Sequence, residues 1–126
     1  MAVLTVDMED PTGYGRIIRE NGNVSCIVEE KDAGPEEKAV REINTGVLVC
    51  PAAKLKGWLD NLGNDNAQGE YYLTDAIAFA VNDGVTVHGV KADSYIEVMG
   101  INDKKQLAEV ERALQSRLVD ELMKEG

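Results

Sequence analysis

Five short polar segments of this 126-residue chain carry groups suited to binding a sugar and a hard cation. They are Asp10–Arg16, Val28–Asp32, Glu42–Gly46, Asn66–Asp75 and Gly100–Asp103. Carboxylates and amides accept hydrogen bonds from sugar hydroxyls, and an amide also donates them. Carboxylate and amide oxygens are also ligands that hard cations such as Mg²⁺ accept. Because none of the five follows the period of a buried strand or helix, we expect some of them to bind a ligand.

Each segment also has a purely structural interpretation. The two glycines around Tyr14 let the backbone approach a ligand, or they form a tight turn that leads into a strand. Glu29 can bind hydroxyls at a strand end or simply be solvated, and Asn44 can satisfy the local backbone. Asn102 can cap the final helix or bind Mg²⁺, and part of Asn66–Asp75 serves to cap a helix. Taken singly, most of the segments favour the structural interpretation.

The elements that must position these segments alternate between strands and helices. Strands are expected at residues 3–6, 15–20, 24–29, 43–50 and 85–90, with a further short one at 95–99. Helices are expected at 51–62, 74–82 and about 103–124, with a loop or single helical turn over 31–38. Asn21 and Gly22 suit the positive φ angles of a hairpin turn, so the second and third strands should be antiparallel. This order predicts an α/β fold with a mixed sheet.

The expected helices have recognisable ends and faces. Pro51 can begin the first because its missing N–H would have no partner there, and Gly63 ends it. Thr74 can cap the second. The last is a long amphipathic helix whose apolar stripe consists of Leu107, Val110, Leu114, Leu118 and Leu122. We expect Trp58 on the first helix, and His88 in its apolar strand, to have structural roles.

Composition restricts the class of protein. With 44% hydrophobic and 29% charged residues, the chain has the composition of an ordinary globular domain. Its net charge of −10 repels a nucleic-acid backbone, so we expect no nucleic-acid partner. No apolar run approaches the roughly 18 to 20 residues of a membrane span, and no secretion signal leads the chain. We therefore expect a cytoplasmic protein with no membrane partner, in which Cys26 and Cys50 are free buried thiols.

Together and in this order, the five segments resemble the sugar-1-phosphate nucleotidyltransferases. The closest resemblance is to the bacterial bifunctional N-acetylglucosamine-1-phosphate uridyltransferases and glucosamine-1-phosphate acetyltransferases. Pro11–Arg16, Glu42–Gly46 and Gln68–Asp75 carry it, and it extends over essentially the whole chain. It implies part of a Rossmann-like nucleotide-diphospho-sugar transferase domain, closed by a long C-terminal helix. Residues 1–102 would form the sugar-binding half of the uridyltransferase domain, and residues 103–126 would form the linker helix.

The resemblance also implies roles for single residues. The backbone of Gly15 would approach the bound sugar nucleotide, and the side chains of Glu29 and Asn44 would contact its N-acetylglucosamine part. Asn102 would coordinate the catalytic magnesium ion and touch the product, together with an aspartate from the other half of the domain. Glu70, Tyr71, Tyr72 and Thr74 would wall the sugar pocket. No side chain of this chain is expected to act as a nucleophile or as a general acid or base.

In the family, N-acetylglucosamine-1-phosphate attacks the α-phosphorus of UTP, giving UDP-N-acetylglucosamine and pyrophosphate for peptidoglycan and lipopolysaccharide precursors. Two polyanions must be neutralised in that reaction, and cations supply this neutralisation. The family's glycine-rich loop, with its arginine and lysine for the UTP phosphates, has no counterpart in this sequence, and neither has the acetyltransferase β-helix. We therefore expect the chain to keep the sugar side of the site and to be inactive alone.

Two alternatives remain open from the sequence. One is a nucleotidyltransferase specific for glucose-1-phosphate or another sugar phosphate. The other is a module without catalytic activity that self-associates as a homo-oligomer through an exposed sheet edge.

Overall fold

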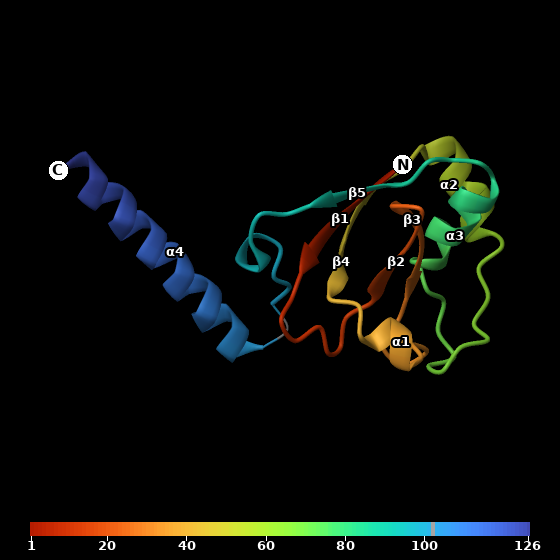
Figure 1. The fold of residues 1–126 in the computed structure, drawn as a ribbon, viewed down its shortest axis with the longest axis horizontal. Coiled ribbons are helices and arrows are strands. Elements are labelled where there is room, and N and C mark those ends of the chain that lie inside the picture. The colour runs from red at the N-terminus through yellow and green to blue at the C-terminus, as the bar shows by residue number, and fades with distance from the viewer. Residues whose placement is uncertain (102) are drawn as a thin grey trace.

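The computed structural model of the chain describes residues 1–101 and 103–126, and within them a five-stranded sheet has the order β3-β2-β4-β1-β5 (Figure 1). The strands are β1 (Ala2–Asp7), β2 (Arg16–Glu20), β3 (Asn23–Val28), β4 (Glu42–Val49) and β5 (His88–Lys91). The second strand pairs antiparallel with the third and fourth, and the first pairs antiparallel with the fourth but parallel with the fifth. The prediction of an α/β fold with a mixed sheet is confirmed.

The hairpin between β2 and β3 forms where the sequence predicts it. Asn21 has a φ angle of 50° and Gly22 has one of 83°, so both central residues adopt the positive angles that a two-residue hairpin turn requires. Glu20 pairs directly with Asn23 across this turn. The local turn chemistry therefore fixes the register next to the turn, and an irregularity between Ile18 and Arg19 shifts the pairing by one residue in the rest of the hairpin.

The core lies between the sheet and two helices, α2 (Ala52–Leu59) and α3 (Asp75–Asn82). Its buried members are Val3, Ile17, Val24, Ile27, Trp58, Ala76, Ile77, Ala80 and Val87. The indole Nε1 of Trp58 donates to Asp83 Oδ2 at 2.8 Å, which joins the two helices at the edge of the core. The structural role expected of Trp58 is thus observed. Both cysteines are free thiols as expected, but they are half-buried rather than buried.

Three elements differ from the sequence prediction. The helix after Pro51 ends at Leu59 rather than before Gly63. Beyond Leu59 the backbone continues with 3₁₀-type hydrogen bonds, from the amide of Asn61 to the carbonyl of Trp58 and from that of Leu62 to that of Leu59. Leu59 itself is 42% exposed. The last strand begins at His88 rather than at Val85, because its partner β1 begins only at Ala2, which pairs with His88. The 95–99 segment is not a strand.

The 95–99 segment contains the 3₁₀-helix η1 (Tyr95–Glu97). The hydroxyl of Ser94 accepts from the amide of Ile96 and so caps the turn. An earlier single turn, α1 (Pro35–Lys38), agrees with the loop or helical turn expected over residues 31–38.

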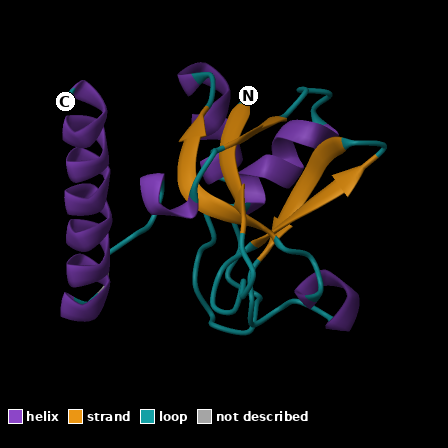
Figure 2. Ribbon diagram, turned by 60° about the vertical axis from the view of Figure 1, so that its left-hand side comes forward, coloured by secondary structure: helices purple, strands orange, loops and turns teal. Residues whose placement is uncertain are grey.

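The long C-terminal helix, α4 (Lys104–Glu125), is present as predicted. Its N-cap is Asp103, whose side chain accepts from the amide of Gln106 at 2.8 Å. The capping role that the sequence offers to Asn102 is thus taken by Asp103. In Figures 1 and 2 the helix stands apart from the sheet, and Leu122 on its apolar stripe is 66% exposed. None of the helices in the described ranges is both long and apolar enough to cross a membrane.

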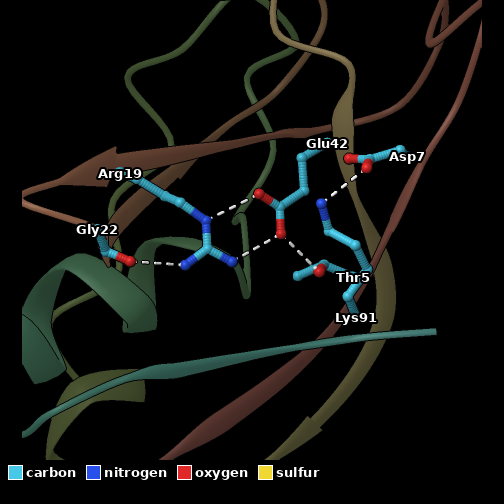
Figure 3. A network of polar contacts seen from close by, with 6 residues as sticks. All are labelled: Thr5, Asp7, Arg19, Gly22, Glu42 and Lys91. Atoms are coloured by element: carbon cyan, nitrogen blue, oxygen red, sulfur yellow. Dashed lines mark hydrogen bonds and ion pairs between the residues drawn. The ribbon is translucent and has the colours of Figure 1, made fainter.

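A polar network joins β2, β4 and β1 across the sheet (Figure 3). Both carboxylate oxygens of Glu42 accept from the guanidinium of Arg19, at 2.8 and 2.7 Å, and the buried hydroxyl of Thr5 donates to the same carboxylate at 2.6 Å. A Cβ at Gly89 would lie 2.4 Å from Arg19 Nη2, so the guanidinium occupies room that only glycine leaves. The hydrogen bonds from Arg19 lower the pKa of Glu42 despite partial burial, which raises it.

This network predicts how stability depends on pH. Because the pKa of Glu42 is lower in the folded than in the unfolded chain, its contribution is complete above the unfolded value, about 4.3. It is lost as the pH falls through the folded pKa. We expect Glu42→Gln to lower the free energy of unfolding at pH 7 by about 1 to 3 kcal/mol. The variant should also lose less stability than the wild type as the pH falls from 5 toward 3.

Urea unfolding at a series of pH values between 7 and 3 measures both effects. The exposed Glu9→Gln is the control, and we expect it to stay within about 0.5 kcal/mol of the wild type at pH 7. Parallel acid profiles for the wild type and Glu42→Gln would show that Glu42 does not make this contribution.

Candidate functional site

Gly15 lies at the centre of the candidate site, immediately before β2 and buried. Arg16 pairs with Val28 across the hairpin, which brings Gly15 beside Glu29. A Cβ at Gly15 would lie 3.2 and 3.3 Å from the two carboxylate oxygens of Glu29 and 3.0 Å from Ile27 Cγ2. The carboxylate is therefore packed against the Gly15 backbone, where the side chain of any other residue would push it away.

Asn44 is joined to the same point from β4. Its backbone amide donates to the carbonyl of Gly15 at 2.8 Å. Its side-chain Oδ1 accepts from the amide of Gly46 at 3.0 Å, which is the local backbone role that the sequence allowed as an alternative. The structure thus brings Gly15, Glu29 and Asn44 together. The side-chain oxygen of Asn44 accepts a hydrogen bond from its own strand.

Thr74 makes a contact with Glu29 that its position in the sequence did not predict. It precedes α3, where capping was expected, but its hydroxyl donates to Glu29 Oε1 at 2.9 Å and caps nothing. This hydrogen bond fixes the orientation of the Glu29 carboxylate over Gly15. The two residues are 45 positions apart in the chain. The only sequence signal for the contact was that both lie in the polar segments singled out above, Val28–Asp32 and Asn66–Asp75.

Asp32 ties the end of β3 to the polar loop that precedes α3. Its two carboxylate oxygens accept from the amide of Ala67 at 2.8 Å and from the hydroxyl of Tyr72 at 3.0 Å. The side-chain Nε2 of Gln68 donates to the same hydroxyl at 2.9 Å. The sequence flagged both segments but did not single out Asp32 as the residue that joins them.

A cleft of about 350 Å³ opens between these segments. It is lined by Ile27, Val28, Glu29, Asp32, Gly63, Asp65, Asn66, Tyr72 and Asp75. Four of these residues carry carboxylates. The pKa of Asp75 is raised, mainly by burial and then by the negative charge of Asp32. Such a lining accepts hydrogen bonds from the hydroxyls of an uncharged ligand and repels phosphate groups. Its chemistry therefore suits a sugar ring better than a triphosphate.

The turn that carries Gly15 also contacts η1. The hydroxyls of Tyr14 and Tyr95 lie 3.0 Å apart, and their rings meet edge to face with centroids 6.4 Å apart. Burial and the hydrogen bond to Tyr14 raise the pKa of Tyr95 to about 12, so the Tyr95 hydroxyl keeps its proton at physiological pH. The contact holds the segment that precedes position 102 against the glycine-containing turn.

The predicted magnesium ligand cannot be placed, since Asn102 lies outside the described residues. Among the residues that are described, no group of three or more histidine, cysteine, aspartate or glutamate side chains could hold a metal ion.

No family model matches the chain, but three curated relatives match it over its whole length. Each is named "Bifunctional protein GlmU". The relative from Herminiimonas arsenicoxydans is 53% identical over 126 residues, that from Aromatoleum aromaticum 55% over 127 residues and that from Cupriavidus metallidurans 54% over 127 residues. The chain spans 28% of the length of each of these proteins.

Proposed function

We propose a function that starts from one premise, namely that the chain belongs to the GlmU family and corresponds to a segment of those proteins. The chain supplies the sugar-recognition side of an N-acetylglucosamine-1-phosphate uridyltransferase, a nucleotidyltransferase of cell-wall precursor synthesis. The complete site forms UDP-N-acetylglucosamine and pyrophosphate from UTP and N-acetylglucosamine-1-phosphate. One observation supports this above the others: Gly15, Glu29 and Asn44 converge at one point.

The chemistry of that point fits an N-acetylated sugar. The Glu29 carboxylate accepts from sugar hydroxyls, and the Asn44 side chain offers both a donor and an acceptor to an acetamido group. The small volume of Gly15 lets the ligand approach the backbone closely. Thr74 keeps the carboxylate in place without competing for both of its oxygens, because only Oε1 accepts from the threonine hydroxyl.

The same chemistry excludes a role in holding the triphosphate. The chain carries a net charge of −10 and its cleft is lined with carboxylates, so a triphosphate would be repelled. Bound Mg²⁺ would neutralise the phosphates in the complete site, and we propose Asn102 as one of its ligands. We propose that the further ligands and the basic groups lie in parts of the longer GlmU proteins that this chain does not span.

A titration of the isotope-labelled chain with UDP-N-acetylglucosamine, followed by NMR, tests the proposal. We expect saturable shifts of the Gly15 and Asn44 amides with a Kd of about 1 mM or below. UDP-glucose should bind at least about threefold more weakly, since it lacks the acetamido group. Equal or tighter binding of UDP-glucose would favour a nucleotidyltransferase for another sugar. Absence of any shift at the two amides would reject the sugar site.

A pyrophosphate-release assay on the chain alone tests the division of labour. With UTP, N-acetylglucosamine-1-phosphate and Mg²⁺ present, we expect no turnover above background, because positioning and neutralising the phosphates supplies most of the catalysis of phosphoryl transfer. Measurable turnover would mean that this chain itself contains the phosphate-binding groups.

A second candidate function, self-association, is favoured by uncovered apolar surface. The exposed large side chains include Val47, Val49 and Val90 on the sheet and Leu107, Leu114, Leu118 and Leu122 on α4. Apolar groups exposed on a sheet or along a helix stripe favour pairing with another copy. Sedimentation equilibrium decides this alternative: a concentration-dependent rise in mass supports a homo-oligomer, and a monomer at every concentration rejects it.

A further inference from the structure

Arg16 is a buried cation that lies within the candidate site but has no role assigned by the proposed function. The residue is only 2% exposed, although its neighbours across the sheet, Val28 and Ile43, are apolar. Its Nη2 donates to Glu30 Oε2 at 2.5 Å, and its Nη1 donates to the carbonyl oxygen of Tyr14. Its Nε has no hydrogen-bond partner among the described residues.

The two partners of this guanidinium flank the two central residues of the site. Tyr14 directly precedes Gly15, and Glu30 directly follows Glu29. One rigid group therefore joins the backbone on one side of the glycine to the side chain next to the binding carboxylate. Gly15 and Glu29 are themselves close, since a Cβ at Gly15 would lie 3.2 Å from a Glu29 oxygen.

We propose that Arg16 is a positioning residue, which holds the Gly15 backbone and the Glu29 carboxylate at the spacing that the sugar requires. This inference rests on the sugar site proposed above. Only arginine suits the position, because its planar fork donates to two acceptors in fixed directions, whereas lysine presents a single compact charge. The side chain thus acts through Gly15 and Glu29 and does not itself touch the ligand.

The energetics of the Arg16–Glu30 ion pair favour a role in positioning the site over a role in stabilising the fold. The side chain of Arg16 is 2% exposed and that of Glu30 is 27% exposed, so both charges lose hydration, and a largely buried pair is often no more stabilising than apolar side chains of similar volume. Leaving Nε without a partner adds a further cost. Replacing both partners with apolar residues should therefore preserve the fold but release the spacing that Arg16 imposes.

The double variant Arg16→Met with Glu30→Leu separates the two roles in the intact chain. We expect it to unfold cooperatively at a urea midpoint close to that of the wild type. The Asn44 amide, which donates to the Gly15 carbonyl, should exchange with solvent about tenfold faster because the Gly15 backbone is no longer held. The Kd for UDP-N-acetylglucosamine should rise about tenfold, as is typical when a residue that orients a binding group is removed.

Two single variants and one control complete the test. Glu30→Gln keeps an oxygen that can accept from Arg16, so its Asn44 exchange and its Kd should stay near the wild type. Arg16→Lys keeps the charge but not the fork, so it should reproduce the loss of the double variant. Arg19→Lys is the matched control, because that arginine lies on the same strand but bonds to Glu42, away from the site, and its Kd should not change.

The outcomes are distinct. The inference is overturned if the double variant folds and keeps the Asn44 exchange rate and the Kd of the wild type. It is also overturned if neither the double variant nor Arg16→Lys folds, because Arg16 is then a structural residue. Faster Asn44 exchange in a chain whose wild type binds no UDP-N-acetylglucosamine supports the positioning by Arg16 while rejecting the proposed function. The exchange measurement needs no ligand, so the two failures are distinguishable.

Discussion

Gly15→Ala is expected to abolish measurable binding of UDP-N-acetylglucosamine and to lower the free energy of unfolding by about 1 to 3 kcal/mol. The added Cβ would lie 3.0 Å from Cγ2 of Ile27, which belongs to the core and is only 6% exposed, so that side chain has little room to move. The Cβ would also lie 3.2 Å from a Glu29 oxygen, and Thr74 holds that carboxylate in place. Urea unfolding and an NMR titration measure the two effects.

Gly57→Ala is the matched control, because it adds the same methyl group where there is space. Gly57 lies inside α2, and no described atom lies within 4 Å of the Cβ that alanine would add. Alanine is favoured over glycine in a helix by about 0.5 to 1 kcal/mol, so this variant should be slightly more stable and bind normally. Wild-type binding by Gly15→Ala would show that the Glu29 carboxylate is not packed against Gly15 in solution.

Local chemistry explains the parts of the fold that the sequence predicts. The Asn21–Gly22 turn needs two positive φ angles, which few other pairs of residues adopt, so the hairpin follows from the dipeptide. The final helix follows from an apolar stripe that repeats over its length, since that signal depends on no other part of the chain. Both features are encoded within the segment that forms them.

Features that depend on a residue distant in the chain are not predicted by the sequence pattern. The start of β5 is set by the start of β1, with which it pairs, and not by the apolar run from Val85. Tyr95–Glu97 has strand-like composition, but the hydroxyl of Ser94 and the contact of Tyr95 with Tyr14 favour a 3₁₀ turn there. Propensity gave the wrong element because side-chain hydrogen bonds and packing outweighed it.

The candidate site divides in the same way. Motif spacing flags the segments that contain Gly15, Glu29 and Asn44. The antiparallel hairpin brings the first two together through a one-residue shift in register between Ile18 and Arg19, which the motif does not predict. The hydrogen bond from Thr74 to Glu29 and the link from Arg16 to Glu30 depend on how side chains turn, which no periodicity encodes. The sequence thus predicts which segments meet but not which atoms hold them in place.

Glu29→Gln is expected to raise the Kd for UDP-N-acetylglucosamine by about 10- to 100-fold, because a hydrogen bond to a charged group contributes about 1.5 to 3 kcal/mol. The fold should be almost unaffected. Glutamine has the size of glutamate, and its amide oxygen can still accept from the Thr74 hydroxyl. The free energy of unfolding should therefore change by less than about 1 kcal/mol, which urea unfolding measures alongside the NMR titration.

Asp65→Asn is the control that separates a specific contact from the general field of the cleft. Asp65 lines the same cleft as Glu29, so its neutralisation removes one negative charge from the same surroundings. If the acidic field alone governed binding, both variants would change the Kd equally and in the same direction. A loss confined to Glu29→Gln means that this carboxylate accepts directly from the sugar, because position beside Gly15, and not charge, is what distinguishes it from Asp65.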